Sequence, residues 1–136
     1  MPVDHEALTR RIIGTAMMVH RELGPGFLES VYRHALAHEL ARVGMPVETE
    51  KRIAVRYRGV PVGEFVADLV VDGRVIVEAK AVRTLASAHE VQLVNYLTAT
   101  GIDVGILVNF GAASLEFRRR SRLFRPPHPD PRTRRD

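Results

Sequence analysis

The sequence predicts an α/β (α+β) domain with a mixed β-sheet flanked by helices, in the element order ααβββαβ(β). Apolar residues recur at helical spacing up to residue 43 and again over residues 87–100, whereas residues 53–81 change to a period of two. The length of 136 residues suits one compact domain. Because helices precede and interrupt the strands, we expect helices on both faces of the sheet.

Two helices separated by a break are predicted first. Residues 4–22 carry apolar side chains at helical spacing, with charged residues between them. A Gly-Pro-Gly segment at residues 24–26 interrupts the pattern, because these residue types do not readily continue a helix. The pattern resumes over residues 28–43, and Gly44 is a typical residue at the C-terminal end of a helix.

Three consecutive strands are predicted next. Residues 53–57 alternate between apolar and charged side chains, which indicates a half-exposed strand. A turn at Gly59 leads into a second strand over residues 60–71, and the Asp-Gly pair at residues 72–73 is a strong hairpin signal. Residues 74–81 are apolar on both faces, which predicts a central strand.

One more helix and two strands complete the expected domain. The helix is predicted over residues 87–100 and ends at Gly101. A buried strand is expected over residues 103–109, and a short edge strand over residues 114–119. Together these elements predict one domain over residues 1–120.

The C-terminal segment is strongly basic and rich in proline. Residues 118–136 contain eight arginines and two aspartates, a net charge of +6, whereas the preceding residues carry −2. We expect residues 121–136, called the basic tail below, to be disordered. Such a tail attracts nucleic acid by releasing counterions, and a purely solubilising role is an equally open alternative.

Composition excludes some classes of protein. The chain has no cysteine, which excludes disulfides and thiolate metal sites. No apolar run approaches the length of a membrane span, and the first residues lack the apolar core of a signal peptide. We therefore expect a cytoplasmic protein with no membrane partner.

Charged residues interrupt the most apolar hairpin of the chain, FVADLVVDGRVIVEAK at residues 65–80. Burying a lone carboxylate is costly unless it is paired or binds a cation. Glu78 and Lys80 lie two apart on one strand and share a face, and Asp68 joins them only if the connecting loop has an odd number of residues. We therefore predict an odd loop or a bulge at residues 72–74.

Two converging carboxylates beside a lysine predict a site for a divalent cation. Oxygen ligands of this kind suit Mg²⁺ or Mn²⁺, which lower the pKa of a bound water and stabilise charge on a phosphoryl oxygen. Lys80 would orient that water or meet the developing negative charge, as phosphodiester hydrolysis requires. The alternative is a simple ion pair between Glu78 and Lys80, with Asp68 as a turn residue.

Polar residues also form a stripe on the helix predicted over residues 87–100. His89, Gln92 and Tyr96 lie three and four positions apart and so share one helical face. A functional site would give this stripe a partner, and so would solvent.

Three segments of the sequence resemble a known family. GFLESVY, residues 26–32, fits the G-x-x-E-x-x-Y signature of the GxxExxY proteins, and the hairpin at residues 65–80 and HEVQLVNYL at residues 89–97 are also similar to that family. The family is placed in the PD-(D/E)XK nuclease superfamily. The resemblance therefore implies a restriction-endonuclease-like fold with a metal site at the centre of the sheet.

The resemblance also implies roles for individual residues. The metal-binding aspartate of the superfamily falls on Asp68, and its D/E-x-K motif falls on residues 78–80, with the carbonyl of Ala79 as a further metal ligand. The proline that precedes the aspartate in the motif's name is replaced by Ala67, which leaves the ligands in place.

Further implied roles fall on the two helices beside the hairpin. The acid of the N-terminal helix falls on Glu29, which would assist the metal or the water. It could instead favour the positive end of the helix dipole. The glutamine of the later helix falls on Gln92, with Tyr96 one turn further on.

The leading functional hypothesis is a Mg²⁺- or Mn²⁺-dependent nuclease acting on DNA or RNA. Its metal ligands would be Asp68, Glu78, the Ala79 carbonyl and Glu29, and Lys80, Gln92 and Tyr96 would join Glu29 in catalysis. One alternative is a catalytically silent module that binds nucleic acid or protein and keeps the fold. Another is a structural protein whose buried charges form a closed network. A homodimer is expected, since one small domain cannot cut both strands in concert.

Overall fold

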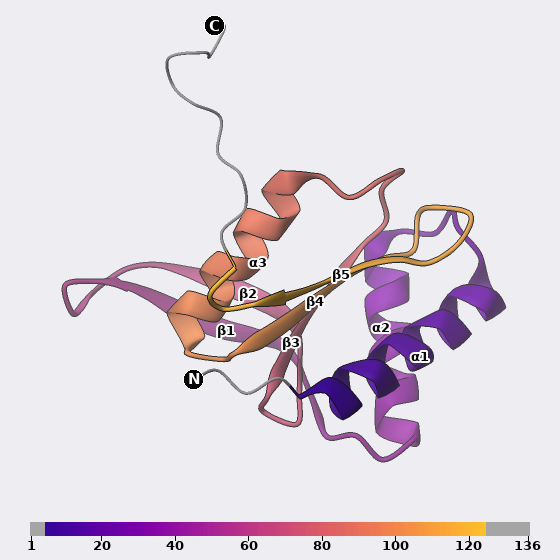
Figure 1. The fold of residues 1–136 in the computed structure, drawn as a ribbon, viewed down its shortest axis with the longest axis horizontal. Helices are drawn as coiled ribbons and strands as arrows, with labels where there is room; N and C mark the ends of the chain where they lie inside the picture. The colour runs from indigo at the N-terminus through magenta and orange to yellow at the C-terminus, as the bar shows by residue number, and fades with distance from the viewer. Residues whose placement is uncertain (1–4, 125–136) are drawn as a thin grey trace, which may run out of the picture.

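The period-two and fully apolar segments form one mixed five-stranded sheet in the order β1-β2-β3-β4-β5 (Figure 1). The computed structural model describes residues 5–124. The strands are β1 (Val47–Tyr57), β2 (Val60–Val71), β3 (Val75–Lys80), β4 (Val104–Asn109) and β5 (Glu116–Ser121). Only β3 and β4 are parallel, and the other neighbours are antiparallel. The predicted fold class and element order are confirmed.

Helices cover both faces of the sheet, as predicted. The helices are α1 (Glu6–Leu23), α2 (Glu29–Arg42) and α3 (Ser87–Thr100). On one face, α1 and α2 pack on the β3 residues Val75 and Val77 in one buried apolar cluster. On the other face, α3 packs on Ile76 in a second cluster. Because neighbouring β3 residues belong to opposite clusters, β3 is buried on both faces, which confirms it as the central strand.

The loop between β2 and β3 decides where the charged residues of the hairpin lie. Val71 pairs with Val75, so the loop contains three residues, 72–74. Asp72 and Gly73 adopt left-handed backbone angles, with φ of 54° and 64°. The predicted odd loop is therefore confirmed.

The distal part of the β1–β2 hairpin extends away from the sheet core (Figure 1). Every residue from 54 to 64, called the hairpin arm below, is exposed. The arm closes in a two-residue turn at Arg58-Gly59, where both φ angles are positive, at 49° and 80°. Positive φ at both turn positions matches the right-handed twist of a hairpin, which explains the glycine.

The element boundaries differ from the predictions mainly in β1. This strand begins at Val47, six residues before the predicted start. Residues 47–52 pair with β2 but are mostly exposed, so no alternation of apolar and polar residues marks them.

The end of the domain lies close to the predicted boundary at residue 120. β5 ends at Ser121, and Arg122 binds Asp103 through a 3.0 Å ion pair. Most of the basic tail falls outside the described residues, so its disorder and the division at residue 120 stay predictions. No helix within residues 5–124 is long and apolar enough to cross a membrane.

Candidate functional site

The two acids of the apolar hairpin meet where β2 and β3 stop pairing. The last ladder pair is Leu69 with Val77. Beyond it, the Asp68 N–H donates to Glu78 Oε2 at 2.7 Å, and the Ala79 N–H donates to Asp68 Oδ2 at 2.9 Å. Each carboxylate thus accepts a backbone N–H of the opposite strand. The geometry brings Asp68 and Glu78 together, as the odd loop requires.

Burial dominates the electrostatics of this pair, and the Asp68 charge adds repulsion at Glu78. Only 4% of the Glu78 surface is exposed. Burial, and after it the Asp68 carboxylate, raises the pKa of Glu78 to about 8. Burial also raises the pKa of Asp68, against the opposing effects of the Ala79 N–H and of the Arg33 and Lys80 charges. A bound cation would relieve both effects, because it favours the ionised form of each acid.

Arg33 of α2 contacts an acid of the candidate site, although no pattern in the sequence predicted this contact. Its Nη1 lies 3.7 Å from Asp68 Oδ1, and its Nη2 donates to Glu50 Oε1 of β1 at 3.1 Å. Its Nε is buried without a hydrogen-bond partner among the described residues. The one signal in the sequence was the spacing of Glu29 and Arg33, which places them one turn apart on α2.

Glu29 is the first residue of α2 and lies within electrostatic reach of Glu78. Its negative charge contributes to the raised pKa of Glu78. Within residues 5–124 its carboxylate makes no hydrogen bond or ion pair, and no group of three or more His, Cys, Asp or Glu residues is arranged to hold a metal. The ligand roles of Asp68, Glu78, the Ala79 carbonyl and Glu29 therefore stay predictions.

Two carboxylates nevertheless fit Mg²⁺. This ion is commonly bound through one or two protein carboxylates, while water and substrate phosphates supply the other ligands. The desolvated, mutually repelling pair at the β2–β3 junction has the chemistry that such an ion requires.

Helix α3 contributes Gln92 and Tyr96 from the opposite side of the site. The Lys80 ammonium donates to Gln92 Oε1 at 3.5 Å, a long hydrogen bond. The Tyr96 ring stacks on Phe65 of β2 with 3.7 Å between ring centroids. Burial raises the pKa of the Tyr96 hydroxyl, and the Glu78 carboxylate adds to the effect. Both α3 residues therefore lie beside the acids and the lysine.

His89 does not share this environment. Its Nδ1 accepts the backbone N–H of Ala86 at 3.0 Å, at the start of α3. The N–H groups at the start of a helix have no partners within the helix, and this local contact supplies one for Ala86. His89 is therefore a helix-capping residue in this structure.

Tyr32 fixes the loop that leads into Glu29. The ring is fully buried and stacks on Phe110, with centroids 4.7 Å apart. Its hydroxyl donates to the Gly24 carbonyl at 2.5 Å and accepts the Phe27 N–H at 3.1 Å. Gly26, between these two contacts, has a φ of 114° that favours glycine. The glycine and tyrosine of the GFLESVY segment thus fix the backbone of the loop that precedes Glu29.

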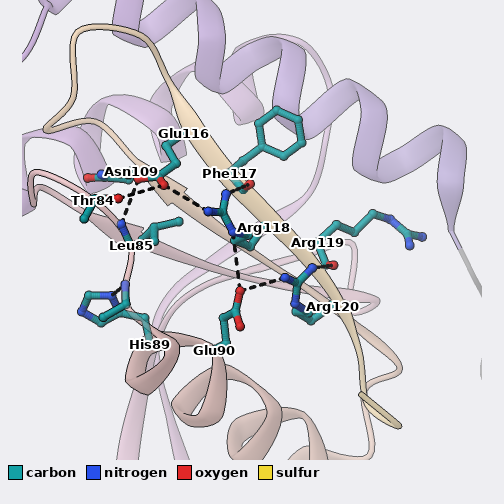
Figure 2. A network of polar contacts seen from close by, with 11 residues as sticks. Thr84, Leu85, His89, Glu90, Asn109, Glu116, Phe117, Arg118, Arg119 and Arg120 are labelled. Atoms are coloured by element: carbon teal, nitrogen blue, oxygen red, sulfur yellow. Dashed lines mark hydrogen bonds and ion pairs between the residues drawn. The ribbon is translucent and has the colours of Figure 1, made fainter. Parts of the chain in front are cut away.

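A separate polar network fixes the loop that follows Lys80 (Figure 2). Asn109 of β4 exchanges two hydrogen bonds with the Val82 backbone, at 2.9 and 2.8 Å. Glu116 of β5 accepts from Asn109 Nδ2 at 3.0 Å and from the Leu85 N–H at 2.9 Å. The Asn109 hydrogen bond is the main reason that the pKa of Glu116 is lowered.

The same network continues to α3. Glu90 lies between two arginines of β5, with 2.8 Å to Arg120 Nη2 and 3.5 Å to Arg118 Nε (Figure 2). Arg118 also contacts Glu116 at 3.2 Å. Because Glu90 precedes Gln92 by two residues, these ion pairs hold the first turns of α3 beside Lys80.

Comparison with known proteins agrees with this architecture. Residues 6–120 match the family model described as the PD-(D/E)XK nuclease superfamily. No curated protein and no solved structure matches the chain. The narrower GxxExxY assignment stays a prediction. The match covers most of the chain and includes Asp68, Glu78, Lys80 and α3, so the chain belongs to the PD-(D/E)XK nuclease superfamily.

Proposed function

We propose that the protein is a Mg²⁺- or Mn²⁺-dependent nuclease that hydrolyses phosphodiester bonds of nucleic acid. The observation that carries this proposal is the meeting of Asp68 and Glu78 at the β2–β3 junction, with Lys80 on the same side. Membership of a superfamily of nucleases supports it. A buried acid beside a half-buried one has little structural benefit unless a cation joins them.

The acids and the Ala79 carbonyl would hold the cation, with Glu29 close to Glu78. When bound, the cation would supply Lewis-acid stabilisation of negative charge at the phosphoryl group. Asp68 is oriented for this role by the Ala79 N–H and by Arg33.

Lys80 and the α3 residues would act on the attacking water and the phosphate. Lys80 carries a positive charge beside both acids and can meet the charge that develops on a phosphate oxygen. Gln92 holds the lysine from α3 and offers an amide to the water. Tyr96 closes the site with its ring on Phe65.

Metal titration tests the proposal most directly. We expect calorimetry to detect Mn²⁺ and Mg²⁺ binding to the wild type and to a control, Glu22→Ala, which removes an exposed acid of α1. Asp68→Ala should lose this binding while circular dichroism shows an intact fold. Wild-type protein should also cleave nucleic acid only with metal, and Lys80→Ala should lower the rate by about 10²-fold or more. Equal metal binding by wild type and Asp68→Ala, with or without nucleic acid, would refute the site.

A catalytically silent binding module is the second candidate. Arg33 and the Ala79 N–H already engage both oxygens of Asp68, so the acids have partners without a metal. Such a module would bind nucleic acid or protein without cleavage at any concentration of Mg²⁺ or Mn²⁺. The cleavage assay therefore separates the two candidates.

A further inference from the structure

A cleft lies beside the candidate site, along the hairpin arm. It has a volume of about 820 Å³ and lies between the arm and α3. Gln92, Tyr96 and Phe65 line it, and the first two are the residues that approach Lys80 and the acids. The cleft therefore shares Gln92 and Tyr96 with the place where chemistry is proposed.

Small apolar side chains and polar side chains share the walls of the cleft. The apolar ones include Ala54 and Val55 from the arm, and Ala88, Val91 and Ala99 from α3, whereas Asn95 and Thr98 of α3 are polar. Small side chains leave a shallow apolar surface that a flat, hydrophobic group can cover. Val55 remains 36% exposed, so this surface is open to solvent.

One arginine lines the cleft, and two more lie on the hairpin that forms one of its walls. Arg56 lines it, and Arg58 lies at the tip of the arm, 5.6 Å above the ring of the exposed Tyr57. Neither arginine forms an ion pair within residues 5–124. Arg52, nearer the core, has a single long contact of 3.8 Å with Glu64. These guanidinium groups are available to an anionic ligand.

We infer that this cleft binds a single strand of nucleic acid and leads it to the acids, an inference that rests on the proposed nuclease function. A single strand presents the faces of its bases and a line of phosphates, which match the apolar walls and the arginines. A duplex hides its base faces by stacking and offers this cleft phosphates and groove edges alone. The apolar walls therefore favour the single strand.

Equilibrium binding to fluorescent oligonucleotides tests the inference. The full-length protein is titrated in EDTA, so that no cleavage occurs, against one single-stranded oligonucleotide and the duplex of the same sequence. The cleft variant is Arg56→Gln with Arg58→Asn, since asparagine tolerates the positive φ at position 58. The matched control, Arg10→Gln with Arg21→Gln, removes two exposed charges from α1.

We expect the wild type and the control to bind the single strand more tightly than the duplex. The cleft variant should bind the single strand on the order of tenfold more weakly. Its slope of log affinity against log salt should be shallower by about 1.4, because each phosphate contact to a single strand contributes about 0.7.

Three results would overturn the inference. These are an unchanged affinity and salt slope in the cleft variant, tighter binding of the duplex, or no binding of the single strand by wild type. Cleavage of both substrates by wild type with Mn²⁺ is measured in parallel. If cleavage persists in any of these cases, the proposed nuclease function stands and only the role of the cleft is rejected. If wild type does not cleave either substrate, the proposed function itself is rejected.

Discussion

Glu78 shows at the scale of one residue how burial and function are coupled. Its carboxyl group is almost fully enclosed beside a second acid, and its pKa is raised to about 8. Between pH 4.5 and 8 the folded protein therefore holds a proton at Glu78 that the unfolded chain releases. The free energy of unfolding must fall as pH rises through this window.

Glu78→Gln should therefore stabilise the metal-free protein at high pH. The amide is neutral and of similar size, so it removes the cost of an ionised, buried acid. We expect a gain on the order of 1–3 kcal/mol at pH 9 and little change at pH 5. Urea unfolding at the two pH values measures this, with Glu22→Gln as the exposed control. An equal effect of Glu78→Gln at both pH values would contradict the assignment.

Parity along two strands, combined with the predicted odd loop, was enough to predict that Asp68, Glu78 and Lys80 lie close together. The ion pair between Arg33 and Asp68 was not predictable in this way, because it joins α2 to β2 and no periodic pattern records it. His89, in contrast, was suggested by its helical spacing to lie at the site, but its ring caps α3.

At the scale of elements, Tyr32 couples the buried core to the loop before α2. Tyr32→Phe should keep the stacking on Phe110 but leave the Gly24 carbonyl and the Phe27 N–H without their partner. We expect a loss of about 1–3 kcal/mol in stability. Tyr57→Phe is the control, since that exposed hydroxyl has no hydrogen bond within the described chain.

Thermal unfolding of the two variants measures this difference. Because the Tyr32 contacts position the start of α2, the Tyr32→Phe variant should also bind Mn²⁺ more weakly if Glu29 assists the metal. A stable Tyr32→Phe variant would show that the loop is held by apolar packing alone.

The helices were predictable because burial of one face imposes a helical period, and the central strands because burial of both faces requires a continuous apolar run. α3 begins and ends at the predicted residues, and β3 and β4 are buried apolar runs. The first half of β1 was missed because an exposed edge strand has no buried face to impose a pattern. The hairpin arm was predicted as strand, but its separation from the core depends on α3 leaving it uncovered, which no local pattern indicates.

The cleft changes the reason for expecting a dimer. Two copies are required if a duplex must be cut on both strands in concert. One copy is sufficient for the single strand inferred here. The oligomeric state and the substrate are therefore linked. A monomer that cleaves single strands would agree with the inferred substrate and would remove the reason for expecting a dimer.

Removing residues 125–136 should leave the stability of the domain unchanged. Two contacts anchor the end of the described domain, the ion pair of Arg122 with Asp103 and the Arg120 guanidinium 4.5 Å above the Phe124 ring. We expect a chain ending at Phe124 to unfold within about 2 °C of the full-length protein, since it keeps both contacts. Differential scanning calorimetry measures this, and a decrease above about 5 °C would show that the removed segment packs on the domain.

The same truncation decides between the two roles of the basic tail. It removes four arginines and two aspartates, and so lowers the net charge from +4 to +2. If the tail binds phosphates, affinity for single strands should fall and the salt dependence should become shallower, while Mn²⁺ binding at Asp68 and Glu78 is unchanged. If the tail only solubilises the protein, the affinity stays the same and the truncated chain aggregates at lower concentration, because net charge opposes association.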